Sequence, residues 1–148
     1  SRKKLETYLE LLSGSILDNL TLAAQMMMFS FGNIAIHSQC FTRIMHKNQI
    51  LLTTLDYQNW DEVDDKNNDE WYNLSLHKNL IINNKVIKTE LTNINDLFIW
   101  LENEIQLQIF ISNGFPHYVE DCEQWRILEN DGENMPHTVV YSNCIQEE

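Results

Sequence analysis

The sequence MMMFSFGNIAIHS, residues 26–38, decides the fold of this chain. Apolar residues alternate with other residues on both sides of Gly32-Asn33, at Met27, Phe29, Phe31, Ile34 and Ile36. A period of two is typical of a strand with one buried face, and a two-residue loop containing Gly is typical of a tight hairpin. The stretch therefore predicts a β-hairpin.

The segments around this hairpin predict a helix before it and more strands after it. Apolar residues from Leu5 to Leu12 follow a helical spacing, and Ser13-Gly14 is a helix-stop signal. Short strand-like runs at 16–17 and 20–22 come next, and strands at 41–44 and 49–53 follow the hairpin across a polar turn. The first half is thus a helix followed by antiparallel strands.

The second half repeats this order. Helical spacing over 74–81 ends at Asn83-Asn84, a strand starts at Val86, and a hairpin is predicted over 97–109. The strings Thr42-Arg43-Ile44 and Trp125-Arg126-Ile127 correspond, and 138–141 reads as a final strand. We expect an α+β fold, an antiparallel sheet with helices on one face, formed by one domain over 1–148. It would contain a duplicated helix-plus-hairpin unit, with pseudo-repeats 5–55 and 72–128. The alternative is that the two halves are unrelated, because any two helix-hairpin segments look alike when only their patterns of apolar and polar residues are compared.

The composition predicts a single soluble domain that folds on its own. The chain has 148 residues, of which 43% are hydrophobic, and no run approaches the roughly 18 apolar residues that a membrane span needs. The N-terminal residues lack the apolar region of a secretion signal. Three cysteines are an odd number in a chain long enough to fold without disulfides, so we expect a reducing cytoplasm.

The charge of the chain is strongly negative. Ten basic and 22 acidic residues give a net charge of −12, which disfavours direct binding of nucleic acid or anionic lipid. Two explanations stay open, namely general solubility and a surface complementary to a basic protein.

The acidic residues concentrate in one predicted loop. Residues 56–71 contain seven carboxylates and one cation, interleaved with aromatic residues that are favoured as interface anchors. The loop is not an EF-hand, because Glu70 stands where the required Gly would be and Leu76 where the closing Glu would be. Its candidate partner-binding residues are Asp56, Tyr57, Trp60, Asp61, Glu62, Asp64, Asp65, Asp69, Glu70 and Trp71.

Signals for catalysis or metal binding are weak. His37, Cys40, His117 and Cys122 could supply zinc ligands, or Cys40 could form a dyad with a histidine. On a regular strand, however, His37 and Cys40 point to opposite faces, and buried thiols with ordinary histidines are the favoured alternative. The four glycines form no nucleophile elbow or phosphate loop. We expect no cofactor and no enzymatic activity.

Arg43 and Arg126 occupy corresponding positions in the two halves. Each lies in a predicted strand beside Ile and an aromatic residue, in a chain poor in cations. Each could bind a carboxylate within the sheet through a bidentate ion pair, or could bind a ligand. The structural ion pair is the favoured explanation.

Three strings together resemble a group of small bacterial proteins. They are HSQCFTRI at 37–44, EQWRI at 123–127 and PHTVVY at 136–141. The resemblance implies an accessory protein of the kind encoded beside toxin genes, foremost an immunity protein.

An acidic immunity protein could neutralise a basic nuclease toxin by imitating the charge of its substrate. Residues 56–71 would face the toxin with Trp60 and Trp71 as anchors, joined by Glu120, Asp121, Glu123, Glu129, Asp131 and Glu133. Three alternatives remain: a phage-type inhibitor of a host defence enzyme, a small hydrolase or metal-binding protein, and a homodimeric module with a large apolar self-complementary face.

Overall fold

The computed structural model describes residues 2–59, 63, 69–114, 122–130 and 136–148, and it confirms the α+β class. The helices are α1 (Arg2–Leu12), the 3₁₀ helix η1 (Thr54–Asn59) and α2 (Asp69–Ile81). The strands are β1 (Ile16–Leu17), β2 (Asn19–Ala23), β3 (Met26–Phe31), β4 (Ile34–Ser38), β5 (Phe41–His46), β6 (Gln49–Thr53), β7 (Asn84–Leu91), β8 (Leu97–Leu101), β9 (Ile105–Phe110), β10 (Glu123–Glu129), β11 (Thr138–Tyr141) and β12 (Ile145–Glu147).

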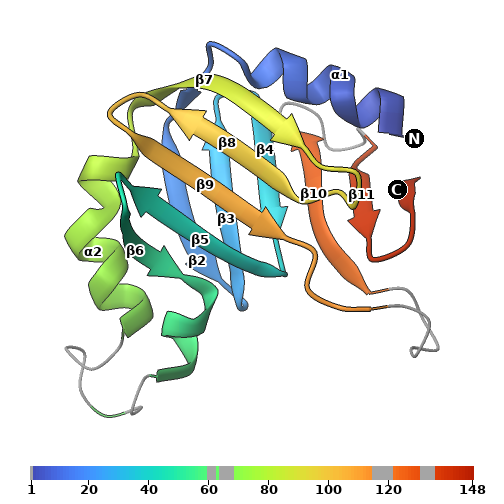
Figure 1. Cartoon of the computed structure of the whole chain (residues 1–148). Helices are drawn as coiled ribbons and strands as arrows, with labels where there is room; N and C mark the ends of the chain where they lie inside the picture. Colours follow the sequence, from blue (N-terminus) through green and yellow to red (C-terminus); the bar gives the residue numbers. More distant parts are fainter. Residues whose placement is uncertain (1, 60–62, 64–68, 115–121, 131–135) are drawn as a thin grey trace.

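The described strands form two antiparallel sheets, where the sequence predicted one. The first has the order β1-β7-β8-β9-β5-β6, and the second has the order β12-β11-β10-β4-β3-β2. In Figure 1 the first sheet lies in front of the second. The chain passes from one sheet to the other at Asp18, between Ser38 and Phe41, and after β9, which is why hairpins adjacent in sequence do not all extend one sheet.

The two halves of the chain exchange strands. In the second sheet, β2, β3 and β4 from the first half are followed by β10 and β11 from the second half. In the first sheet, β7, β8 and β9 from the second half are followed by β5 and β6 from the first half. Neither half therefore completes its sheet without the other.

The core lies between the sheets. Buried and half-buried residues alternate along β3, β8 and β9, as expected for strands with one buried face. Residues of both sheets and both helices belong to one hydrophobic cluster, in which Trp125 and Phe29 are the largest fully buried side chains. α1 packs against β7, whereas α2 packs against η1, β6 and β2. The predicted covering of one face by both helices is not confirmed.

Backbone conformation explains which turns the sequence revealed. Gly32 has a φ of +71° at the first position of the two-residue loop between β3 and β4, where a type II′ turn requires positive φ. Ala24 and Gln25 connect β2 to β3 with φ values of 51° and 63°. Neither residue favours positive φ, so the sequence carried no turn signal there.

Two boundaries differ from the sequence prediction. The predicted loop 56–71 begins inside η1 and ends inside α2, which starts at Asp69. Acidic residues favour a helix N-terminus, and the prediction counted their charge only as a sign of solvation. The strand at 138–141 is not the last one, because β12 follows it and pairs with β11. None of the three described helices is long and apolar enough to cross a membrane.

Gln124 joins two of the three places where the chain passes from one sheet to the other. Its backbone carbonyl accepts hydrogen bonds from Gln39 N at 2.8 Å and Cys40 N at 3.1 Å, where the chain leaves β4 for β5. Its side-chain Oε1 accepts a hydrogen bond from Ser112 N at 2.7 Å, just after β9. Its Nε2 donates to Asn113 Oδ1 and, at 3.1 Å, to Cys122 O. The buried side chain thus has its polar atoms satisfied, as burial requires.

We expect Gln124→Leu to lower the free energy of unfolding by about 2–3 kcal/mol, because it removes three side-chain hydrogen bonds, to Ser112 N, Asn113 Oδ1 and Cys122 O, each worth about 1 kcal/mol. Denaturation by urea, followed by circular dichroism, measures the change. Gln49→Leu, at an exposed position of β6, is the control and should stay within about 0.5 kcal/mol of the unmodified chain. Equal urea midpoints for both variants would contradict this role of Gln124.

Candidate functional site

The ends of the acidic segment lie on elements that contact each other. Asp56 belongs to η1, where its Oδ2 accepts a hydrogen bond from Thr53 N at 2.9 Å. η1 packs against α2, so the segment leaves and re-enters the described fold at one place. Five of the remaining predicted partner-binding residues lie outside the described residues: Trp60, Asp61, Glu62, Asp64 and Asp65. For the other four the structure describes only the backbone: Tyr57, Asp69, Glu70 and Trp71. The prediction of a partner-binding surface therefore stays a prediction.

The second predicted acidic group does not form a wholly exposed surface. The side chain of Glu123 is 14% exposed and points to Arg126, and Glu129 is half-buried. Glu120, Asp121, Asp131 and Glu133 lie outside the described residues. Because an internal cation already neutralises Glu123, this residue is a poor contact for a basic partner.

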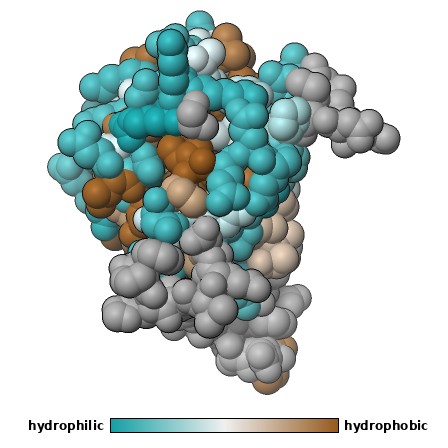
Figure 2. All heavy atoms as spheres, turned by 90° about the vertical axis from the view of Figure 1, so that its right-hand side faces the viewer, coloured by the Kyte–Doolittle hydropathy of each residue, from teal (hydrophilic) through white to brown (hydrophobic). Residues whose placement is uncertain are grey.

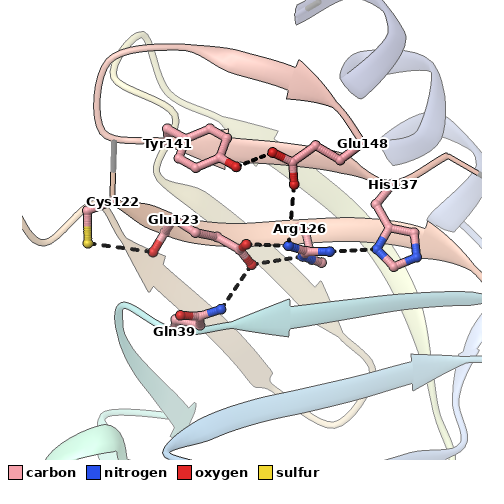
Figure 3. Close-up of polar contacts among 7 residues, drawn as sticks. All are labelled: Gln39, Cys122, Glu123, Arg126, His137, Tyr141 and Glu148. Atoms are coloured by element: carbon pink, nitrogen blue, oxygen red, sulfur yellow. Dashed lines mark hydrogen bonds and ion pairs between the residues drawn. The ribbon is translucent and has the colours of Figure 1, made fainter. Parts of the chain in front are cut away.

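Glu123 and Arg126 form the centre of a polar cluster on β10 (Figure 3). Arg126 Nε donates to Glu123 Oε2 at 2.8 Å, and Nη2 donates to Oε1 of the same carboxylate. Gln39 Nε2 also donates to Oε2, at 3.1 Å. Residues three apart in a regular strand point to opposite faces, but a bulge between Glu123 and Trp125 brings both side chains to one face. The pair has the bidentate geometry that the sequence predicted, and whether its role is structural stays a prediction.

The same cluster connects β10 to the last strands. Glu148 Oε2 lies 3.8 Å from Arg126 Nη2, and the Tyr141 hydroxyl donates to Glu148 Oε1. This hydrogen bond, with lesser contributions from burial and charge, raises the pKa of Tyr141 to about 12. His137 Nδ1 lies 2.7 Å from Arg126 Nη1, and the hydrogen bond to Glu123 raises the pKa of the Arg126 guanidinium. The cluster holds β10, β11 and β12 together through charge-assisted hydrogen bonds.

His37 borders this cluster from the neighbouring strand, since it pairs with Arg126 in the register of β4 and β10. Burial lowers the pKa of His37, and nearby Arg126 and His137 lower it further, against a smaller opposing effect of Glu123. The imidazole is therefore neutral at neutral pH.

The side of the molecule that carries β10, β11 and the C-terminus is seen in Figure 2. Most of its coloured surface is hydrophilic, and its hydrophobic residues occur in separate small groups. A protein interface core is usually apolar and aromatic. The described residues on this side therefore do not form such a core.

Cys40 does not have the environment of a nucleophile. It is 5% exposed, and its Sγ lies 3.5 Å from Ser38 Oγ, where the chain turns from β4 to β5. Burial raises the pKa of the Cys40 thiol to about 11, so the thiolate is scarce at neutral pH. His37 instead borders the polar cluster, where the charge of Arg126 influences it, and Cys122 is exposed. Within the described ranges no three His, Cys, Asp or Glu side chains gather as metal ligands, and His117 lies outside them.

Arg43 differs from its counterpart Arg126. Its Nε donates to Gln108 Oε1, and its guanidinium carbon lies 5.2 Å from the centroid of the Phe110 ring. No carboxylate of the described part of the chain lies within ion-pair distance, so the ion pair predicted for Arg43 is wrong for these residues. The reason is the register, because β9 places Gln108 opposite Arg43.

The outer face of the first sheet is a feature that the sequence interpretation missed. Four aromatic rings form a chain across three strands: the centroids are 6.2 Å apart for Trp100 and Phe98, 5.6 Å for Phe98 and Phe110, and 6.0 Å for Phe110 and Phe41. All four side chains are half-buried. The available signal was that Phe98 and Trp100 fill positions of β8 where alternation leads one to expect polar residues.

Comparisons with known proteins found no match among family models, curated proteins or solved structures.

Acidification should destabilise the protein partly through His37. Since the folded-state pKa of His37 is below its ordinary value of 6.5, the unfolded chain gains a proton that the folded chain does not, and stability falls as the pH drops below 6.5. We expect His37→Gln to lose less stability than the unmodified chain between about pH 7.5 and about pH 5.5. Urea titrations at both pH values measure this, and identical losses would contradict it.

Removing one partner of the cluster should be costly. Arg126→Met leaves a nearly buried Glu123 carboxylate without its bidentate donor, and we expect a loss of about 2–3 kcal/mol. The double variant Arg126→Met/Glu123→Gln should recover part of that loss. Lys47→Met is the control, because its pair with Glu104 is 4.0 Å long and well exposed; it should change stability by less than about 0.5 kcal/mol. Strictly additive losses in the double variant would contradict the coupling.

Proposed function

We propose that the chain is a non-catalytic protein-binding module that inhibits a basic enzyme, of the type of an immunity protein that neutralises a nuclease toxin. One observation carries the proposal. Seven carboxylates and one cation lie in residues 56–71, and this segment connects two elements, η1 and α2, that pack against each other. The two ends of this acidic segment therefore lie next to each other on the molecule.

Electrostatics supports an inhibitor of this kind. A concentrated negative charge accelerates association with a cationic protein and rejects partners of the wrong charge. A nuclease must itself attract an anionic substrate, so an acidic protein can compete for the same surface. Such binding needs no reactive group, which agrees with the protonated thiol at Cys40.

The same proposal includes a reducing, cytoplasmic location. Neither Cys40 nor Cys122 forms a disulfide within the described part of the chain, although Cys122 is exposed to solvent. Free exposed thiols persist best where disulfide formation is suppressed.

We further propose that the two halves of the chain are copies of one helix-plus-strands unit. The support is the exchange of strands: after its helix, each half gives three consecutive strands to one sheet (β2, β3 and β4, or β7, β8 and β9) and the following strands to the other (β5 and β6, or β10, β11 and β12). β1 departs from this order, because it pairs with β7. In this arrangement β2 corresponds to β7, and the hairpin β3-β4 corresponds to β8-β9.

Affinity capture with the tagged chain, from the cells that encode it, tests the proposed function. We expect recovery of a basic enzyme whose activity the purified chain suppresses. Recovery of a protein encoded beside the chain would support the immunity role, and recovery of a host defence enzyme by a phage-encoded chain would support the anti-defence alternative. The absence of any basic partner would contradict both.

Charge removal in the acidic segment should slow binding of the captured enzyme. We expect Asp61→Asn/Asp64→Asn to lower the association rate constant roughly tenfold at low salt. The matched control Glu10→Gln/Asp18→Asn removes the same charge from exposed positions on α1 and before β2 and should have a much smaller effect. Stopped-flow or surface-plasmon measurements distinguish the variants, and equal rates for the two would rule out the segment as the contact.

A further inference from the structure

The outer face of the first sheet contains two rows of side chains that the strand register defines, and we call them together the aromatic face. One row consists of Glu90, Phe98, Gln108, Arg43 and Thr53, from β7 to β6. The other row consists of Lys88, Trp100, Gln106, Met45 and Ile50, in the same strand order. Phe110 and Phe41 continue the face beyond the first row.

The chemistry of this face is that of an interface core. Trp, Phe, Met and Arg are the residues enriched in the centres of protein interfaces. The rings contact one another, and Lys88 Nζ lies 4.4 Å from the centroid of Trp100. Ile50 is 55% exposed at the end of its row. None of the described helices lies over this face, which points toward the viewer in Figure 1.

The charge of the face differs from that of the chain. Its two rows contain Arg43, Lys88 and one carboxylate, Glu90, so their net charge is 2 − 1 = +1, whereas the whole chain carries −12. Two cations are too few for a nucleic-acid surface, and a cationic protein would meet them as like charges. A partner with a near-neutral, aromatic surface of the same composition fits best.

We propose that this partner is a second copy of the chain, packed face to face through the aromatic face about a twofold axis. The axis runs between the two rows, perpendicular to the strands, so each row of one copy lies over the other row of its partner. Lys88 then meets Glu90 of the second copy, Trp100 meets Phe98, and Gln106 meets Gln108. Because the contact is isologous, each of these pairs occurs twice.

The size of the face sets the expected strength. Strands about 4.8 Å apart give the five strands a width of roughly 20 Å, and the rows with Phe110 and Phe41 give a similar height. The resulting planar area of roughly 400 Å² per copy, about 800 Å² for the pair, is below the range of stable specific interfaces and within that of weak, transient ones. The dimer is accordingly concentration-dependent and weak. This inference does not rest on the proposed function.

The test uses sedimentation equilibrium and light scattering of the full chain over micromolar to millimolar concentrations. We expect the unmodified chain to pass from monomer to dimer. Lys88→Glu places two carboxylates opposite each other, and Glu90→Lys places two ammonium groups opposite each other, so each variant alone should dimerise at least about tenfold more weakly. Both positions are exposed, and circular dichroism checks that the variants fold.

Mixing the two single variants is the decisive measurement. In the mixed dimer every contact between positions 88 and 90 joins opposite charges again, so dimerisation should return to about the unmodified strength. Trp100→Ser should weaken dimerisation in a way that no mixture restores. Leu11→Glu, at a leucine of α1 that is 60% exposed, is the control and should leave dimerisation unchanged.

Three results would overturn the proposal. The first is an unmodified chain that stays monomeric over the whole range. The second is a dimer that neither Lys88→Glu nor Trp100→Ser weakens, because another face would then form it. The third is a monomer whose capture of the basic enzyme is lost in Lys88→Glu, which would assign the aromatic face to that enzyme.

Discussion

The two sheets depend on the hydrogen bonds that Gln124 makes where the chain changes sheet. One backbone carbonyl receives the amides of Gln39 and Cys40, and the side chain of the same residue binds the segment that follows β9. At these two places the chain enters the sheet that the other half begins: β5 joins the sheet of β7, β8 and β9, and β10 joins the sheet of β2, β3 and β4. These hydrogen bonds lie next to the pairings of β4 with β10 and of β9 with β5, which join strands of the two halves. Unsatisfied buried polar groups are costly, so the hydrogen bonds of Gln124 favour the observed exchange over arrangements that break them.

The polar cluster of β10 is a consequence of that crossing. The bulge that follows Glu123 lies directly at Gln124 and turns the Glu123 carboxylate to the side of Arg126. Arg126 then forms ion pairs both with the Glu123 carboxylate beside it and with Glu148, which follows the last strand. Burial is the main reason that the pKa of His37 on the adjacent strand is lowered, and the positive charge of Arg126 lowers it further. A backbone irregularity of one residue thus positions a charged pair that contributes to the ionisation of a side chain on the neighbouring strand.

The sequence predicted the elements well and their assembly poorly, for physical reasons. Period-two alternation and Gly32-Asn33 identify β3 and β4, and the same alternation identifies β8 and β9, because these signals are local. The exchange of strands depends on Gln124, whose partners are distant in sequence, and a lone Gln carries no pattern. Arg126 could be predicted as half of an ion pair, whereas Arg43 could not be distinguished from it, because the difference lies in the register that places Gln108 opposite Arg43. The aromatic face was not predicted, because the alternation of residues along β8 was used only to identify the buried positions and not to examine the residues on the outer side.

The distribution of charge couples the two proposed surfaces. Two copies that carry −12 each repel one another, and this repulsion opposes dimerisation through an aromatic face whose own charge is near zero. A cationic partner bound at the acidic segment reduces the charge of each copy and hence the repulsion between copies. Because a coupling free energy is reciprocal, dimerisation must in turn favour binding of the cationic partner. The near absence of carboxylates from the aromatic face is consistent with this coupling, since a face free of the surplus charge adds least to the repulsion between two such acidic chains.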